Sequence, residues 1–303
     1  MSRESYRRTL RGKGFFTPKP HSSKHKQDEI INIAKTQVIM VAPTTPIYEA
    51  IRIMARERFR RLPIANPSTK RLEGMVTATD IVDYLGGGKK FELIQRKFSG
   101  NFYTAMNEAI KLLMTQNPAS ITQTATVSEA IQKMKQEKIG GLPIVDEKGA
   151  IQGIITERDI VNLFADMISG VTVSQLMSDR VISILPKATI FEAEKTMTAQ
   201  RFRRLPIAAE GRIVGIVTAM DVLTFFGTSE VFKRLQSGMI TQVLATPALE
   251  IASKDVATIG PNEDIGQAAK TMKERNIGAL PVIQKGKLIG IITERDFFKV
   301  IED

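Results

Sequence analysis

One short pattern occurs four times in this chain, and the repetition constrains its architecture more than any other feature. Each copy contains a Leu-Pro pair, with an Ala 13 residues before the proline and a Met nine residues before it. Twelve to fourteen residues after the proline comes Thr-x-x-Asp, with a Gly three positions before the Thr. Such fixed spacing is typical of repeat proteins in which each copy forms one supersecondary unit. The prolines are Pro63, Pro143, Pro206 and Pro281.

The four copies alternate between two kinds. Copies one and three share Phe-Arg-Arg-Leu-Pro-Ile-Ala and end in Thr-Ala-x-Asp, whereas copies two and four share Ile-Gly-x-Leu-Pro and end in Thr-Glu-Arg-Asp. This alternation indicates that a unit of two copies was duplicated as a whole. We therefore expect copy one to pair with copy two, and copy three with copy four.

Each copy is expected to fold in the order strand, helix, strand, strand, helix, which gives an α/β (α+β) fold. The segment Val38 to Val41 suits the first strand, and Ile47, Ala50, Ile51 and Met54 then fall on one helical face. Similar helices are expected in the other copies, with Ser/Thr-x-x-Glu capping boxes at Thr126/Glu129 and Thr189/Glu192. One copy alone is too short to bury a stable core, so pairs should pack sheet against sheet.

The connection between copies one and two is longer than the others. It contains Gly86-Gly87-Gly88-Lys89-Lys90, which lacks the spacing and the Ser/Thr of a phosphate loop and is interpreted as a linker. A helical segment near residues 91–114 follows it, and the counterpart in the second half runs from about Gly227 to Leu244.

Composition argues against catalysis and membrane insertion. The chain has no cysteine and only two histidines, both before residue 26, so the repeats offer neither a metal-ligand cluster nor a nucleophile–base arrangement. We expect no catalytic residue, no metal and no enzymatic activity. No run of about 18 apolar residues is present, so a membrane span and a signal peptide are not expected. A cytoplasmic location is the resulting expectation.

The N-terminal segment is strongly basic. Residues 1–26 hold eight basic side chains and one acid, which places +7 of the net charge of +11 there. Without a helical or alternating period, this tail is expected to be disordered or docked on a partner. Its basic and aromatic residues favour RNA or the ribosome over a membrane surface, although a merely solubilising arm is the alternative. The candidate RNA-binding residues are Arg3, Arg7, Arg8, Arg11, Lys13, Phe15, Phe16 and Lys19.

The repeated Leu-Pro strand and the Gly-x-x-Thr-x-x-Asp ending resemble CBS domains, and each pair of copies resembles a Bateman module. The resemblance covers residues 36–303 and is similar in plan to stand-alone prokaryotic and archaeal four-CBS proteins and to the gamma subunit of AMP-activated protein kinase. It implies a tail at 1–35, one module at 36–168 and another at 169–303. The four domains would span about 36–90, 112–168, 173–228 and 244–303.

The same resemblance implies a binding site for adenine nucleotides. The terminal aspartates would accept hydrogen bonds from ribose hydroxyls, and the threonines, at helix starts, would meet phosphate. Adenine would lie near Ile64, Ile144, Ile207 and Val282. The ribose-binding candidates are Asp80, Asp159, Asp221 and Asp296, and the phosphate-binding threonines are Thr77, Thr156, Thr218 and Thr293. Because Thr-x-x-Asp is also an ordinary capping box, a purely structural role is the alternative.

Phosphate binding also needs cations. Arg60 and Arg203 precede the Leu-Pro strands of copies one and three, while Arg158 and Arg295 lie inside Thr-Glu-Arg-Asp of copies two and four. Guanidinium groups suit phosphate geometry. The alternative for each arginine is a solvated charge or an ion pair with Glu157 or Glu294.

The function expected from these features is non-catalytic sensing of AMP, ADP or ATP by a regulatory protein. Nucleotide binding would control partner binding, with RNA or the ribosome as the partner of the tail. A regulatory subunit of an enzyme such as a kinase is one alternative, and a DNA-binding transcription regulator is another. A homodimer formed through the modules is also compatible with the pattern.

Overall fold

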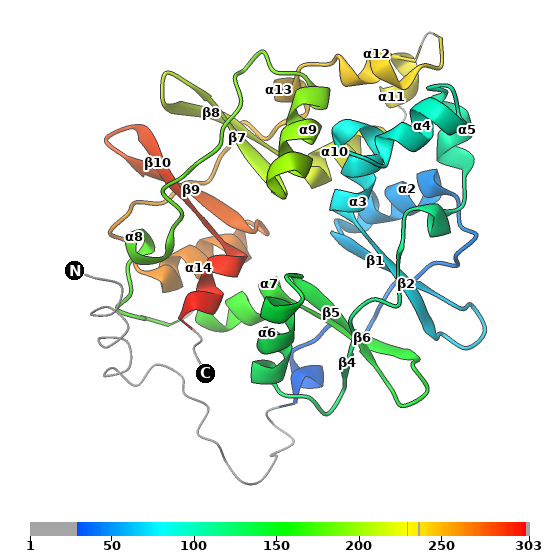
Figure 1. The fold of residues 1–303 in the computed structure, drawn as a ribbon. Helices are drawn as coiled ribbons and strands as arrows, with labels where there is room; N and C mark the ends of the chain where they lie inside the picture. Colours follow the sequence, from blue (N-terminus) through cyan, green and yellow to red (C-terminus); the bar gives the residue numbers. More distant parts are fainter. Residues whose placement is uncertain (1–28, 166, 229, 236, 301–303) are drawn as a thin grey trace.

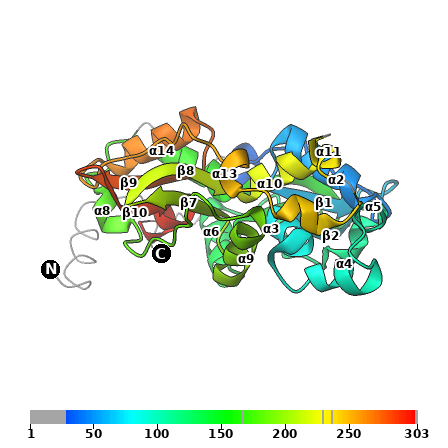
Figure 2. The ribbon, with the colours of Figure 1, turned by 90° about the horizontal axis from the view of Figure 1, so that it is seen from above.

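The computed structural model describes residues 29–165, 167–228, 230–235 and 237–300. Four repeats surround a common centre (Figure 1). Seen at right angles to that view, the molecule is flat (Figure 2). The tail residues proposed to bind RNA lie outside the described residues.

From the first helix onward, the helices and strands of each repeat follow the expected order. Those of repeat one are α2 (Ile47–Glu57), β1 (Arg61–Ala65), β2 (Leu72–Thr77), α3 (Ala78–Val82) and the π-helix η3 (Asp83–Gly87). Those of repeat two are β4 (Ile121–Thr122), α6 (Val127–Gln136), β5 (Gly141–Val145), β6 (Ile151–Thr156), α7 (Glu157–Val161) and η5 (Asn162–Phe164). Those of repeat three are α9 (Ile190–Gln200), β7 (Arg204–Ala209), β8 (Arg212–Thr218) and α10 (Ala219–Phe226). Those of repeat four are α14 (Ile265–Glu274), β9 (Ala279–Gln284), β10 (Lys287–Thr293) and the 3₁₀ helix η6 (Glu294–Lys299).

The first strand of each repeat is shorter than expected. Only repeat two has a regular one, β4, which pairs in parallel with β5. In the other three repeats it is reduced to a single parallel bridge: Val41↔Ile64, Ile184↔Ile207 and Ile259↔Val282. The prediction of a strand over residues 38–41 is therefore wrong except for Val41. The apolar residues of this segment are close to the core, but the chain pairs at one position only.

Short elements precede and connect the repeats. They are η2 (Ile30–Asn32), α4 (Phe91–Lys97), α5 (Phe102–Asn107), η4 (Ile110–Leu112), β3 (Thr115–Gln116), α8 (Val173–Leu176), α11 (Glu230–Lys233), α12 (Ile240–Leu244) and α13 (Ala248–Ile251). The single helical segment expected near residues 91–114 is thus broken. Asn101 caps α5 after a reversal at Ser99 and Gly100, both of which have positive φ.

Each lead-in segment packs on the second long strand of its partner repeat. β3, before repeat two, pairs with β2 of repeat one, and Lys35, before repeat one, bridges to Ile154 of repeat two. The second half has the same exchange, because Ser178 bridges to Ile291 and Ser253 bridges to Ile216. The exchange binds repeat one to two and repeat three to four.

Packing between the two halves is made by helices. One hydrophobic core contains both repeat one and repeat three, with Ile51 and Met54 of α2 and Val222 and Phe226 of α10 completely or almost completely buried. A second core joins the end of repeat two to repeat four, and a third joins repeat two to Phe298 of η6. The sheets therefore form the contacts within each half, while the helices form those between halves.

Candidate central nucleotide site

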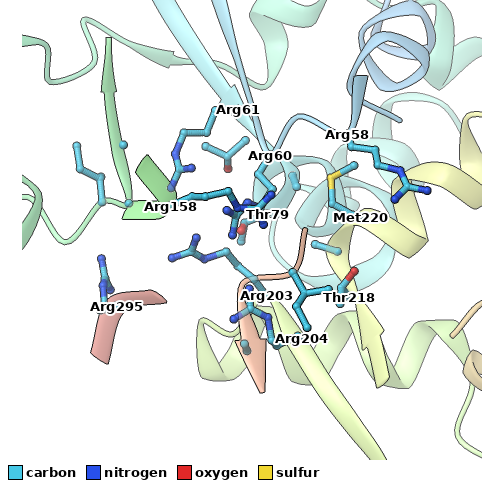
Figure 3. Close-up of a pocket in the computed structure, with 18 of the residues that line it drawn as sticks. Arg58, Arg60, Arg61, Thr79, Arg158, Arg203, Arg204, Thr218, Met220 and Arg295 are labelled. Carbon is cyan, nitrogen blue, oxygen red and sulfur yellow. The ribbon is translucent and has the colours of Figure 1, made fainter. Parts of the chain in front are cut away.

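A cavity of about 1260 Å³ lies where the four repeats meet. Residues from all four repeats line it, and arginine is the most prominent residue type among them (Figure 3). These arginines are Arg58, Arg60, Arg61, Arg158, Arg201, Arg203, Arg204, Arg275 and Arg295. The acids of its lining are Glu137, Asp221 and Asp255. The cavity is therefore suited to an anion.

Two buried glutamates hold the four arginines predicted from the sequence. Glu294 accepts two hydrogen bonds from Arg60, at 2.7 and 2.9 Å, and one from Arg158 at 2.9 Å. Both glutamates are only 2% exposed, and Glu157 accepts from Arg203 at 3.0 Å and from Arg295 at 3.2 Å. Each set joins side chains from both halves of the molecule. The ion-pair alternative is thus present in the structure, and the phosphate role of these arginines stays a prediction.

The electrostatics of this cluster favour ionised glutamates. Burial by itself would raise the pKa of Glu294, but Arg60 and Arg158 hold that pKa far below its usual range. The pKa of Glu157 is likewise lowered, since Arg203 and Arg61 outweigh the opposing effect of burial. Both carboxylates therefore remain charged throughout the neutral range.

Two further arginines make the cluster cationic. Burial lowers the pKa of Arg61 to about 9, assisted by Arg203 and Arg60, and burial also lowers that of Arg204 to about 10. Both side chains stay protonated near pH 7. Six arginines then share two carboxylates, and the surplus of positive charge faces the cavity.

This cluster explains why the repeats alternate in sequence. A Cβ on Gly140 would lie 2.4 Å from Glu157 Oε2, and one on Gly278 would lie 2.7 Å from Glu294 Cδ. The even repeats thus need Gly where they carry the glutamate of Thr-Glu-Arg-Asp. The odd repeats have Arg-Arg at the aligned position and supply the guanidinium groups.

The four Thr-x-x-Asp segments all form capping boxes. In each, the Asp Oδ2 atom accepts hydrogen bonds from the Thr backbone N–H and hydroxyl, at 2.6–2.9 Å. The threonine hydroxyl proton is consequently already donated to the aspartate. A phosphate at these helix starts would have to be met by backbone N–H groups or by the arginines.

The second carboxylate oxygen distinguishes the four aspartates. Asp80 Oδ1 accepts from Lys90 Nζ at 2.6 Å, and Asp296 Oδ1 accepts from Lys299 Nζ at 2.6 Å. For Asp159 and Asp221, no hydrogen bond to Oδ1 is formed by any residue within the described ranges. Of the four aspartates, only these two have a carboxylate oxygen that accepts no hydrogen bond from the described residues.

Asp221 is the one of the four that lines the large cavity. Thr218 and Met220 of repeat three also line the cavity (Figure 3). Its lining further includes Thr224 of repeat three and residues 255–257 and 275–277 of repeat four. Burial raises the pKa of Asp221, although hydrogen bonds from Thr218 oppose this effect. We call this part of the cavity the repeat-three cleft.

The equivalent region of repeat two is much smaller. A cavity of about 80 Å³ is lined by Thr156 and Arg158 and by residues 58–61 of repeat one. Asp159 lines neither cavity.

The position proposed for adenine requires a correction. Ile64, Ile144, Ile207 and Val282 are all completely buried in the hydrophobic cores. Strand residues alternate between faces, and it is the preceding prolines Pro63, Pro143 and Pro281 that line cavities. Adenine would therefore contact the proline face, because the isoleucines face the helices.

Comparison with known proteins agrees with this architecture. The family model described as the CBS domain matches residues 30–87, 109–166, 173–227 and 248–303. The chain belongs to the CBS domain family. Within the described residues, no helix is long and apolar enough to cross a membrane, and none of their His, Cys, Asp and Glu side chains form a group that could hold a metal ion.

Two relatives match most of this chain. The uncharacterized protein MJ1225 of Methanocaldococcus jannaschii is 34% identical over 273 residues, or 89% of this chain and 98% of the relative. Its crystal structure, described as that of a candidate archaeal homolog of g-AMPK, matches with a TM-score of 0.86 at 33% identity, covering 90% of this chain and 100% of that one. An uncharacterized 33.4 kDa protein in the ribosomal RNA operon of Thermofilum pendens is 34% identical over 257 residues, 85% of each chain.

Proposed function

We propose that this CBS protein is a non-catalytic regulator that binds an adenine nucleotide, AMP, ADP or ATP, in the repeat-three cleft. The observation that carries the proposal is Asp221, whose Oδ1 is unpaired among the described residues and which lines a large arginine-rich cavity. A carboxylate oxygen can accept hydrogen bonds from both vicinal hydroxyls of a ribose, as acidic residues do in dinucleotide-binding folds. The neighbouring arginines would neutralise the phosphates.

Signalling would follow from the location of the cavity. Arg60 and Arg158 of the first half and Arg203 and Arg295 of the second half reach the same centre, where they share Glu157 and Glu294. A phosphate group there would compete with the glutamates for guanidinium groups. Because each glutamate bonds across the two halves, a nucleotide would alter their relative preference for two arrangements.

The binding step is tested by thermal unfolding in the presence of AMP, ADP and ATP. A ligand at 100 times its dissociation constant stabilises a protein by about 2.7 kcal/mol. We expect an upward shift of the unfolding midpoint in the wild type and none in Asp221→Ala. Asp80→Ala is the matched control, since Asp80 is already engaged by Lys90, and it should retain the shift. An unchanged midpoint of the wild type with all three nucleotides would contradict the proposal.

Nucleotide binding would control the binding of a macromolecular partner, and two partners are considered. The similarity to a protein described as a candidate homolog of g-AMPK favours a regulatory subunit of an enzyme such as a kinase. RNA or ribosome binding through the tail remains a prediction, because its residues lie outside the described ranges. If a protein partner is captured in stoichiometric amount, and if its binding persists after nuclease treatment and with the shortened chain 27–303, the regulatory-subunit function is favoured. Loss of binding on shortening, with a steep salt dependence, would favour RNA.

A further inference from the structure

We propose that Lys90 is a built-in competitor for the ribose site of repeat one, so that nucleotide is kept out of that cleft. The inference rests on the proposed function and specifies which clefts the protein uses. Lys90 Nζ donates to Asp80 Oδ1 at 2.6 Å and to the backbone carbonyl oxygen of Leu113 at 2.9 Å. The lysine therefore takes one of the acceptor positions on the carboxylate oxygen that a ribose would need.

A comparison of two clefts in the same cavity isolates the effect of Lys90. The three residues before the ribose aspartate line the cavity in both repeats. They are Thr77, Ala78 and Thr79 in repeat one and Thr218, Ala219 and Met220 in repeat three. Segments 117–119 and 255–257 also line it at equivalent places.

The two clefts differ at their deep ends. Asp221 and Thr224 line the cavity in repeat three, whereas the equivalent Asp80 and Asp83 of repeat one do not. Lys90 bonds to both of these residues, through Nζ to Asp80 and through its backbone N–H to Asp83 Oδ1 at 2.9 Å. In repeat three the residue ten positions after the aspartate is Val231, which is completely buried in the hydrophobic core.

The glycine-rich segment before Lys90 is ordered and directs this contact. It was interpreted as a linker, but Gly86 and Gly87 belong to the π-helix η3 and pack against α9. A Cβ on Gly88 would lie 2.4 Å from Asp83 Oδ1, so a larger residue would have to move the carboxylate that accepts the Lys90 backbone N–H. The segment therefore positions Lys90, which is the role that the linker interpretation missed.

Repeat four has reached the same arrangement from another position. Lys299 lies only three residues after Asp296, yet its Nζ donates to Asp296 Oδ1 at 2.6 Å and to the carbonyl oxygen of Leu176 at 2.7 Å. Leu176 and Leu113 are equivalent lead-in residues, each followed by Met. Two lysines from non-equivalent sites thus contact equivalent atoms. This second case supports the view that an ammonium group at the ribose aspartate is a feature of unused clefts.

The Lys90 ammonium group is a stronger competitor for the Asp80 carboxylate than a ribose hydroxyl. The ammonium–carboxylate contact is a charge-assisted hydrogen bond between partly buried groups, with side-chain exposures of 29% for Lys90 and 21% for Asp80. Ribose hydroxyls also form charge-assisted hydrogen bonds with a carboxylate, but they are neutral donors, so only the ammonium group adds the attraction between opposite charges. A nucleotide entering repeat one would have to displace the Lys90 ammonium group from its contact with Asp80.

The test is calorimetric titration of the full chain with AMP. We expect about one site per chain in the wild type and about two in Lys90→Met, with affinity at the new site rising by about tenfold or more. Lys90→Gln, which can still donate to Leu113, provides a second variant if Lys90→Met folds poorly. Lys89→Met is the matched control, because exposed Lys89 forms no side-chain hydrogen bond or ion pair within the described residues, and it should bind like the wild type.

Double variants assign the sites. Lys90→Met combined with Asp221→Ala should retain about one site, and Lys90→Met combined with Asp80→Ala should lose the added one. An unchanged number of sites in folded Lys90→Met and Lys90→Gln would overturn the inference while leaving the proposed function intact. Binding by Lys90→Met alone, with none in the wild type, would support the inference and overturn the proposed cleft. No binding by any variant would overturn both.

Discussion

At the scale of single residues, the buried glutamates determine how the centre is held together. Glu157 and Glu294 each bind two guanidinium groups from the opposite half of the molecule, and each lies against a glycine of its own repeat. Removing one partner of a buried ion pair destabilises a protein by more than the intact pair stabilises it, because the remaining charge has no counter-ion. Loss of either carboxylate should thus leave a large uncompensated positive charge.

We predict that Glu294→Gln lowers the free energy of unfolding by about 3–5 kcal/mol at neutral pH. The folded pKa of Glu294 is depressed, so its contribution is present above the unfolded value of about 4.3 and is lost as pH falls below it. The difference between wild type and variant should therefore shrink as pH falls below about 4. Urea unfolding at several pH values measures it, and Glu92→Gln, at an exposed helical pair, is the control. A difference that stays constant with pH would contradict this explanation.

At the scale of elements, α9 differs from its three counterparts. Its positions Ile190, Ala193 and Met197 continue the apolar pattern, but Glu194 stands where the other repeats have Ile51, Ile131 and Ala269. Glu194 is completely buried against Gly86 of η3, and neither of its carboxylate oxygens has a hydrogen-bond partner within the described part of the chain. Burial raises the pKa of Glu194 well above its usual range.

We predict that Glu194→Met stabilises the protein by about 1–3 kcal/mol at pH 7, because it removes an unsatisfied buried polar group while keeping an unbranched side chain. The folded pKa is raised, so the wild-type carboxyl costs stability as pH rises above about 4.3. The advantage of the variant should grow with pH above that value. Chemical denaturation from pH 4 to 8 tests this, and an advantage independent of pH would contradict it.

Sequence patterns predicted the elements better than their contacts. The capping boxes at Thr126 and Thr189 are confirmed because they depend on residues three apart. Arg-Arg and Thr-Glu-Arg-Asp suggested phosphate-binding arginines, with an ion pair to Glu157 or Glu294 as the alternative. Which arginine pairs with which glutamate was not predictable, because Arg60 and Glu294 lie 234 positions apart and no local pattern encodes the pairing. Lys90 and Lys299 were missed for a related reason, since they lie at different distances from their aspartates.

At the scale of the whole molecule, the arginines at the centre outnumber the carboxylates that pair with them, so the centre carries an excess of positive charge. The six arginines of the cluster come from all four repeats and share two glutamates. Because both halves contribute to this surplus of positive charge, an anion at the centre would reduce the repulsion between them and strengthen their association. The molecule should therefore respond as a unit to a small polyanion.

We predict that inorganic pyrophosphate raises the unfolding midpoint at constant ionic strength, and that Arg204→Met reduces this gain because it removes one of the surplus buried charges. Differential scanning calorimetry with and without pyrophosphate measures both effects. Arg96→Met is the control, since Arg96 belongs to an exposed pair far less buried than the cluster. A pyrophosphate gain of equal size in Arg204→Met would show that the central surplus is not responsible.

The most direct measurement is a crystal structure of the wild-type protein grown with AMP. The account predicts a nucleotide in the repeat-three cleft with its ribose on Asp221 Oδ1, and Lys90 still bound to Asp80. A structure with AMP seated on Asp80 in place of Lys90, or with the repeat-three cleft empty, would contradict it.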